Sequence, residues 1–370
     1  MKCKLGEIVD ITMGQSPKSI YYNQVGEGYP FLQGNRTFGL KYPTFDTYTT
    51  VMTKLAKSGD VIMSVRAPVG ALNITPRDMC LGRGVCSLRM KNGNQEFLYY
   101  MMKYYVSDLI SKESGTVFGS VNRNDINDLE VDIPENVEKQ VRIGRILSSI
   151  DDKIELNNQI NNNLEQQAQA IFKSWFVDLE PFSNRKPSDW SVSTLGNVSI
   201  MGAGGDKPQN VSPIKTDLYK YPIYSNGLSN EGLYGFTDKP KISEESVTVS
   251  ARGTIGFVCL RHIPYVPIVR LVTLTPKTEI ISAKYLYLWL KQLHITGTGT
   301  TQQQLTVPDF QKTEILVPSQ EIVTLFTATV DPIFEKIWAN QNENEKLSSL
   351  RDTLLPKLIS GELDVSSIDL

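Results

Sequence analysis

Residues 137–176 read VEKQVRIGRILSSIDDKIELNNQINNNLEQQAQAIFKSWF, and the architecture follows from this segment. It contains no proline and a single glycine, Gly144. Its apolar side chains recur every three or four residues, as in the seam of a coiled coil. They are Ile143, Leu147, Ile150, Ile154, Leu164, Ala168, Ile171 and Trp175. Forty helical residues at about 1.5 Å each make a rod of roughly 60 Å. The segment therefore predicts one long helix whose apolar face packs on another helix.

A second segment with the same spacing lies near the end of the chain. Adding 183 to the first set of positions gives Phe326, Val330, Ile333, Ile337, Leu347, Arg351, Leu354 and Leu358. This segment contains Pro332, which cannot donate a backbone hydrogen bond and clashes with the preceding turn of a helix. We therefore expect a kink or a helix restart near Asp331. Two such helices packed antiparallel would form a spacer.

Asparagines interrupt both seams at matching positions. Asn157 and Asn161 lie in the first seam, and Asn340 and Asn344 lie in the second. Asparagine in a seam costs stability but fixes register, because each amide finds its hydrogen bond in only one alignment. The four residues are therefore candidate register determinants. The alternative is that they are solvated positions at which the helices diverge.

The segments that precede the two helices also repeat, in the same order and at an offset that drifts from about 190 to 183 residues. The matches are Leu5-Gly6 with Leu195-Gly196, Tyr29-Pro30 with Tyr221-Pro222, residues 61–66 with 247–252, residues 97–99 with 285–287, and residues 131–134 with 315–318. Short β-branched runs bounded by turn residues predict strands in both copies. The sequence therefore predicts an α+β fold, in which two pseudo-symmetric globular α/β domains are separated by two long antiparallel coiled-coil helices. The predicted segments are 1–134 and 181–318 for the domains, 135–180 for the first helix, and 319–370 for the second helix and tail.

The charge follows these segments. The chain carries a net charge of −2, yet residues 1–134 and 185–318 carry +2 and +4, whereas residues 135–184 and 319–370 carry −3 and −5. Phosphate binding needs a local positive potential and not a basic total. The N-terminus lacks an apolar signal segment, no apolar run is long enough to span a bilayer, and the four cysteines have no metal or disulfide spacing. We expect a reduced, cytoplasmic protein with no membrane association.

No known catalytic motif fits the sequence. His262 and His294 are the two histidines of the chain and lack metal-ligand spacing. The glycine-rich run at 201–205 has Lys207 where a dinucleotide loop needs its third glycine, and no P-loop pattern occurs. The tetrapeptide at 331–334, Asp-Pro-Ile-Phe, lacks the second proline of the adenine methyltransferase motif. We therefore expect no catalytic residue, no bound cofactor and no metal.

Two strings near the ends of the helical segments resemble a known family. Residues 171–178, Ile-Phe-Lys-Ser-Trp-Phe-Val-Asp, and residues 354–363, Leu-Leu-Pro-Lys-Leu-Ile-Ser-Gly-Glu-Leu, are similar to the central and C-terminal conserved regions of type I restriction–modification specificity subunits. The Leu-Gly pairs and the run at 59–66 also resemble that family, and the resemblance covers essentially the whole chain.

This resemblance implies two target recognition domains that each bind one half of a bipartite double-stranded DNA target. It implies helices that set the spacing of the half-sites and bind two methyltransferase subunits. Those subunits would use S-adenosylmethionine to methylate adenine N6, and restriction/translocase subunits could complete the assembly. The chain itself would be non-catalytic and hold no cofactor.

Candidate DNA contacts are polar residues at matching positions of the two copies, because base edges are recognised by side chains that donate or accept in pairs. They are Ser64, Arg66, Ser250 and Arg252 at strand ends, and Gln33, Asn35, Arg36, Ser225 and Asn226 in loops. Gln302 and Gln303 are candidates for a different reason: residues 300–304 of the second copy face a different string, residues 116–120, in the first, so the two strings could carry different specificities or be neutral loops. Structural ion pairing or turn chemistry is the alternative role for these residues. Lys41, Lys54 and Lys57 are candidate phosphate contacts. Candidate partner-binding residues are Ile171, Phe172, Trp175, Phe176, Leu354, Leu355 and Leu358.

Two other functions compete with this one. The chain could be a stand-alone DNA methyltransferase or nuclease with a divergent active site, which methyl transfer or cleavage by the purified chain would reveal. It could also be a coiled-coil scaffold with no role on DNA, which the absence of salt-dependent DNA binding would reveal.

Overall fold

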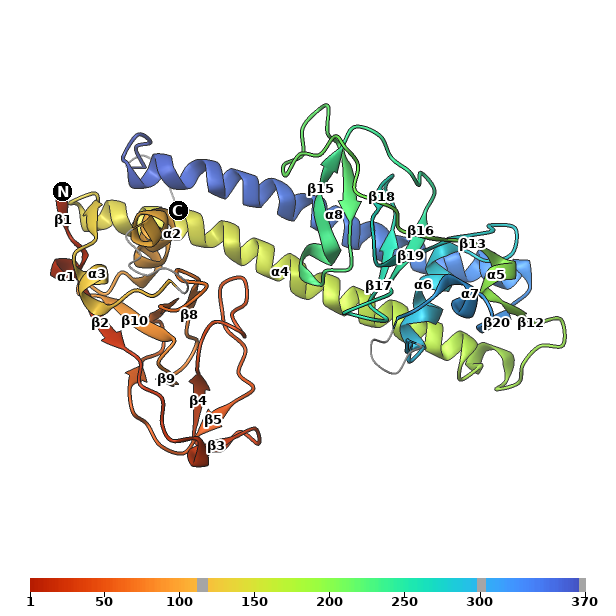
Figure 1. The fold of residues 1–370 in the computed structure, drawn as a ribbon, viewed down its shortest axis with the longest axis horizontal. Helices are drawn as coiled ribbons and strands as arrows, with labels where there is room; N and C mark the ends of the chain where they lie inside the picture. Colours follow the sequence, from red (N-terminus) through yellow and green to blue (C-terminus); the bar gives the residue numbers. More distant parts are fainter. Residues whose placement is uncertain (112–118, 298–303, 366–370) are drawn as a thin grey trace. The chain divides into compact units, whose positions relative to one another are not determined.

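The computed structural model describes residues 1–111, 119–297 and 304–365 (Figure 1). The chain folds into two compact units. Unit 1 comprises Met1–Gln159 and Ala339–Leu370, and unit 2 comprises Ile160–Trp338. Within the described ranges, no helix has the length and apolarity needed to cross a membrane.

Two helices of 40 residues each, α4 (Val137–Phe176) and α8 (Gln320–Ile359), each contribute one segment to unit 1 and one to unit 2. In unit 1, Asp151 contacts Arg351 and Asn157 contacts Asn344, so the helices run antiparallel. In unit 2, Asn161 contacts Ile337 while Phe172 lies against Phe326, which gives the same direction. The prediction of two long antiparallel helices is confirmed.

Of the two alternatives expected near Asp331, the helix restart is wrong and the kink stays a prediction. α8 is one helical element from Gln320 to Ile359 and passes through Pro332. A proline removes one backbone hydrogen bond from a helix, but the turns around this one are held by packing. Val330, Phe334 and Ile337 are all buried in the core of unit 2. Burial of these side chains offsets the local cost.

Unit 1 contains a four-stranded antiparallel sheet with the strand order β2-β10-β7-β8. Its strands are β2 (Val9–Met13), β7 (Val61–Ser64), β8 (Leu72–Ile74) and β10 (Val85–Met90). The helix α2 (Gln95–Ser111) shares one core with this sheet and with Ile143 and Leu147 of α4. A second sheet, β3-β5-β4-β9-β6, has five short strands, and β1 pairs with β11. These strands are β1 (Lys2–Lys4), β3 (Tyr22–Asn23), β4 (Tyr29–Leu32), β5 (Tyr48–Thr49), β6 (Leu55–Ala56), β9 (Met79–Leu81) and β11 (Glu130–Asp132).

Unit 2 repeats the main sheet as β13-β19-β16-β17, also antiparallel. Its strands are β13 (Ser199–Ala203), β16 (Ser246–Ser250), β17 (Val258–Arg261) and β19 (Leu271–Pro276). The helix α6 (Ala283–Gln292) takes the place of α2 and packs in the core with Phe326 and Val330 of α8. A three-stranded sheet, β15-β14-β18, and the pair β12-β20 complete the unit. These strands are β12 (Ser191–Thr194), β14 (Tyr221–Tyr224), β15 (Leu233–Thr237), β18 (Val266–Pro267) and β20 (Glu314–Val317).

The two units have the same main-sheet topology and the same order of short helices. α1 (Leu5–Ile8) and α3 (Arg123–Asn127) of unit 1 correspond to α5 (Leu195–Val198) and α7 (Val307–Phe310) of unit 2. The predicted fold class, α+β with two similar globular α/β parts and two long helices, is confirmed. The segment boundaries at 134, 180 and 318 stay a prediction.

Candidate nucleic-acid interface

In unit 1, two predicted loops meet at one edge of the main sheet, the edge at which β7 ends and β10 begins. The backbone N–H of Val65, directly after β7, donates to the carbonyl oxygen of Gly84 at 2.9 Å. The N–H of Gly84 donates to the carbonyl oxygen of Gln33 at 3.0 Å. Gly84 is therefore bonded to Gln33 and to Val65, the residue before Arg66. The side chains of Arg66 and Gln33 are both exposed, so this edge presents a cation and an amide.

A cleft of about 560 Å³ lies beside this edge. Gln33 and Arg36 line it together with Arg83. Arg36 pairs with Asp46 at 2.6 Å, and this hydrogen bond lowers the pKa of the Asp46 carboxyl. Both side chains are exposed, so this ion pair contributes little to the stability of unit 1. Arg36 can therefore bind another anion in place of the Asp46 carboxylate. Asn35 is only partly exposed, and its carbonyl oxygen accepts from Phe38 in a turn.

Unit 2 forms the corresponding edge from the same elements. The N–H of Ala251 donates to the carbonyl oxygen of Arg270 at 2.8 Å, and the Nδ2 of Asn226 donates to the carbonyl oxygen of Arg252 at 2.7 Å. Ser225 donates through Oγ to the Oδ1 of Asn226 at 3.2 Å. The predicted residues Ser225, Asn226 and Arg252 are thus brought together. Arg252 and Arg270 line a cleft of about 600 Å³.

The two candidate serines are not available to DNA. Ser64 is buried, and its Oγ donates to the carbonyl oxygen of Pro68 at 2.7 Å and accepts from the N–H of Ala71 at 2.9 Å. Ser250 is also buried, and its Oγ has no hydrogen-bond partner among the described residues. Their proposed base contacts are therefore wrong. Ser64 instead holds the turn that follows β7, next to Arg66.

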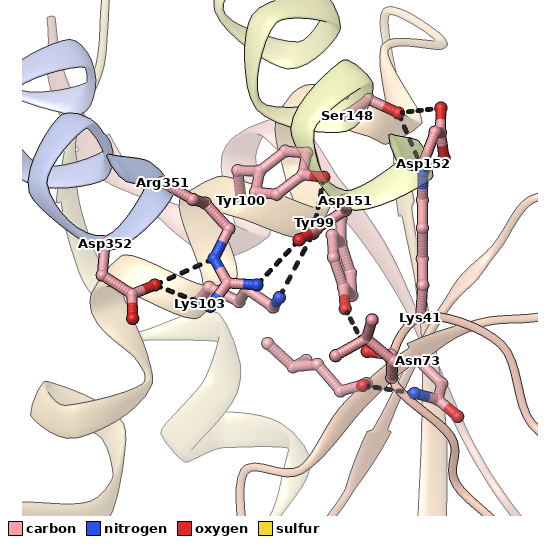
Figure 2. Close-up of polar contacts among 12 residues, drawn as sticks. Lys41, Asn73, Tyr99, Tyr100, Lys103, Ser148, Asp151, Asp152, Arg351 and Asp352 are labelled. Carbon is pink, nitrogen blue, oxygen red and sulfur yellow. Dashed lines mark hydrogen bonds and ion pairs between the residues drawn. The ribbon is translucent and has the colours of Figure 1, made fainter. Parts of the chain in front are cut away.

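The three candidate lysines occupy different surroundings. Lys41 is buried, and its Nζ donates to Ser148 Oγ at 2.8 Å and pairs with Asp152 at 2.6 Å, both on α4 (Figure 2). Its prediction as a phosphate contact is wrong, because the ammonium is already satisfied inside unit 1. Lys54 and Lys57 are exposed. Lys57 precedes β7 and therefore lies at the opposite end of that strand from Arg66.

Gln302 and Gln303 lie outside the described residues. Two exposed arginines at the two edges were missed, Arg83 in unit 1 and Arg270 in unit 2. Neither has a matching arginine in the other copy, so the repeat does not mark them. Ser120 and Gln304, which are also exposed, belong to the differing strings 116–120 and 300–304 but were not named as candidates themselves.

The four seam asparagines lie where the two helices face each other. Asn157 is buried, and its Nδ2 donates to Glu343 and to the Oδ1 of Asn344, each at 2.9 Å. Asn344 donates in turn to Asn158 at 2.9 Å. Asn161 donates to the carbonyl oxygen of Ile337 at 3.4 Å, and Asn340 is buried. Such cross-helix bonds are what a register determinant requires, and the role itself stays a prediction.

The candidate partner-binding residues belong to the cores. Phe172 and Phe176 lie in the core of unit 2 and Leu358 lies in that of unit 1, whereas Ile171, Trp175, Leu354 and Leu355 are half-buried and pack against these cores. All seven join the helices to the globular parts of their own units. The three buried side chains are not available to a partner, and for the four half-buried ones partner binding stays a prediction.

Comparisons with known proteins agree with this architecture. The family described as type I restriction modification DNA specificity domain matches residues 1–166 and again residues 187–349. The MjaIX type I restriction enzyme specificity subunit of Methanocaldococcus jannaschii is 28% identical over 352 residues, covering 85% of this chain and 80% of the relative. The HindI specificity subunit of Haemophilus influenzae is 28% identical over 357 residues, covering 72% of this chain and 77% of the relative.

A solved structure shares the fold. The crystal structure of a type I restriction-modification S subunit from M. genitalium superposes with a TM-score of 0.61 at 18% identity, covering 99% of this chain and 96% of the other. The resemblance drawn from the sequence is confirmed. Because the family matches most of the chain in two consecutive copies, the protein belongs to the family of type I restriction modification DNA specificity domains.

Proposed function

We propose that this chain is the specificity subunit of a type I restriction–modification complex and that it recognises a bipartite double-stranded DNA target. One observation carries the proposal: the same sheet edge is built twice, and each copy places an arginine at the same position, Arg66 in unit 1 and Arg252 in unit 2. Arginine is the side chain that most often recognises guanine, through paired hydrogen bonds to O6 and N7. Two edges would recognise two half-sites.

The charge distribution supports DNA as the ligand. The segments that form the sheets are basic, whereas the segments that form the helices are acidic. Arg66, Arg83 and Arg270 are exposed at the two edges. Local positive potential of this kind attracts phosphate, while the arginine and amide groups supply base contacts.

The helices would dock two methyltransferase subunits, and restriction/translocase subunits would join the same complex. In this assignment the partners bind S-adenosylmethionine and methylate adenine, while this chain binds no cofactor and catalyses nothing. Within the described residues, no group of three or more His, Cys, Asp or Glu side chains is arranged to hold a metal. Family membership supports the proposal, and methyl transfer by the purified chain would contradict it.

Methylation mapping tests the proposed function. The chain is co-expressed with its adenine methyltransferase subunit in a host without DNA methylation, and N6-methyladenine is located by long-read sequencing, with each protein omitted in turn. We expect a split motif with a fixed gap that requires both proteins. The same marks from the methyltransferase alone would show that recognition lies elsewhere and would favour the scaffold function.

A matched pair of variants extends the test. Arg66→Ala should relax or abolish one half of the motif, and Arg252→Ala should do the same to the other half. Each lost arginine–guanine pair is expected to cost about 1–3 kcal/mol of discrimination. If either variant weakened both halves equally, the assignment of one unit to each half-site would be wrong.

A further inference from the structure

The two sheet edges can be compared position by position, because the strand registers define the equivalence. In unit 1, Ser64 of β7 pairs with Val85 of β10. In unit 2, Ser250 of β16 pairs with Leu271 of β19. Two residues beyond each serine lie Arg66 and Arg252. The residue before β10 is Gly84, and the residue before β19 is Arg270.

A third position at each edge follows from the next hydrogen bond. The N–H of Val121 donates to the carbonyl oxygen of Val65 at 3.1 Å, and the N–H of Leu305 donates to that of Ala251 at 2.9 Å. The residues just before these donors, Ser120 and Gln304, are therefore equivalent. Ser120 forms an isolated antiparallel β-bridge with Arg66. Gln304 lines the same cleft as Arg252 and Arg270.

At one of the three edge positions the two units have the same residue, and at the other two positions they have different residues. The arginine is present in both units, whereas Gly84 is replaced by Arg270 and Ser120 by Gln304. These replacements change base-recognition chemistry. Glutamine can bond adenine at N6 and N7, a second arginine can bond guanine, serine makes one bond to several bases, and glycine makes none through a side chain.

The backbone of Arg270 gives an independent indication. Its φ of 73° lies in the left-handed region, which residues other than glycine rarely adopt. Arg270 is exposed and lines the wall of the cleft. Unfavourable backbone conformations of this kind cluster at ligand-binding positions. The strained backbone therefore holds an exposed arginine on the cleft wall.

We infer that Arg270 and Gln304 are the specificity-determining residues that make the half-site of unit 2 differ from that of unit 1, where Gly84 and Ser120 stand. The inference rests on the proposed function. Arg66 and Arg252 supply a contact common to both half-sites. The equivalent pairs Gly84/Arg270 and Ser120/Gln304 select the bases on which the half-sites differ.

The test uses the full chain with its methyltransferase subunit and maps methylation for two variants of unit 2, Gln304→Ser and Arg270→Gly. Each variant should lose preference at one base position of a single half-site, by on the order of tenfold or more. The reciprocal variant Ser120→Gln should change the other half-site. Gln209→Ser is the matched control, because Gln209 is an exposed glutamine of unit 2 outside the cleft and should leave the motif unchanged.

Three outcomes overturn the inference. An unchanged motif in Gln304→Ser and Arg270→Gly, with a normal wild-type motif, removes the inference and leaves the proposed function intact. Weaker methylation of an unchanged motif, with a shallower salt dependence, would make these residues phosphate contacts. A wild-type chain that directs no motif would overturn the inference and the proposed function together. Because both side chains are exposed, each variant should keep the melting temperature of the wild type. A thermal melt of each variant therefore distinguishes these outcomes from loss of folding.

Discussion

Asp151 is the residue on which the charge network of unit 1 centres (Figure 2). It is fully buried on α4, and its carboxylate accepts from Arg351 of α8 at 2.7 Å and from Tyr100 of α2 at 2.8 Å. Lys103 of α2 lies 3.5 Å away. Burial raises the pKa of Asp151, but Lys103 and the hydrogen bond from Arg351 outweigh it, so the pKa lies below its ordinary value. The network explains why Arg351 occupies a seam position.

Asp151→Asn should destabilise unit 1 strongly. Removing one partner of a buried charge network leaves the others uncompensated and costs about 3–5 kcal/mol. Asp352→Asn is the control, because Asp352 also bonds Arg351 but is exposed, and its loss should cost at most about 1 kcal/mol. Urea denaturation measures both. Equal effects of the two substitutions would mean that Asp151 contributes no more than a surface carboxylate.

His262 gives unit 2 a distinct acid response. Its ring stacks on Trp338 with 4.1 Å between ring centroids, and burial, followed by the nearby charges of Lys284 and Arg261, lowers its pKa from 6.5 to about 4. Because the unfolded chain takes up this proton at a higher pH than the folded chain, the stability of unit 2 should fall as the pH drops from 6.5 towards 4.

The change His262→Gln should remove that part of the pH dependence. Carboxylates also titrate in this range, so the informative quantity is the difference between variant and wild type in the free energy of unfolding at pH 7 and at pH 4.5. His294→Gln controls for the loss of a histidine. If the wild type and His262→Gln lost the same stability between these pH values, the buried ring would have no part in the acid response.

At the scale of the element, the long helices could be predicted from the sequence, whereas the candidate DNA-contact sites could be predicted only in part. The bounds of α4 match the predicted 137–176, because a periodic apolar pattern of 40 residues is a local signal. The predicted restart at Pro332 failed, because tertiary packing outweighs one lost hydrogen bond. The edge positions of Arg66 and Arg252 followed from the repeat.

Other errors arose from contacts between residues distant in the sequence. Lys41 finds its partner Asp152 on α4, 111 residues away, and nothing local marks it as buried. Trp175 has the spacing of an apolar face, but that spacing does not show whether the face meets the core or a partner. Arg270 required strand registers, which the sequence does not contain.

Docking of the methyltransferase should therefore depend on exposed apolar residues of the helices, such as Leu156 of α4 and Leu350 of α8, which are 51% and 48% exposed. Leu156→Glu and Leu350→Glu should weaken the complex while the chain keeps its melting temperature, as measured by light scattering and calorimetry. Trp175→Glu is the contrast: Trp175 packs on Phe176, Phe182 and Phe326, so unit 2 should lose about 3–5 kcal/mol. If the complex with the methyltransferase subunit kept its mass in both leucine variants, the subunit would bind at another surface of the chain.

At the scale of the whole molecule, the duplication couples the two helices. Both α4 and α8 pass from one unit into the other, α4 between Gln159 and Ile160 and α8 between Trp338 and Ala339. Cross-helix bonds lie on both sides of these points, Asn157 with Asn344 in unit 1 and Asn161 with Ile337 in unit 2. If only one helix changed in length, the cross-helix bonds of unit 1 and those of unit 2 could not both form. Both sets of bonds can therefore be kept in a longer molecule only if the two helices are lengthened together.

Inserting seven residues at both points should therefore lengthen the gap between the half-sites. Seven residues are about two turns, so the seam keeps its phase, and they add about 10 Å of helix. At about 3.4 Å per base pair, the gap in the methylated motif should grow by roughly three base pairs while both half-site sequences stay the same. Insertion into α4 alone is the control and should lower the melting temperature, because the asparagine bonds cannot all form. A folded, active double insertion with an unchanged gap would show that the helices do not set the spacing.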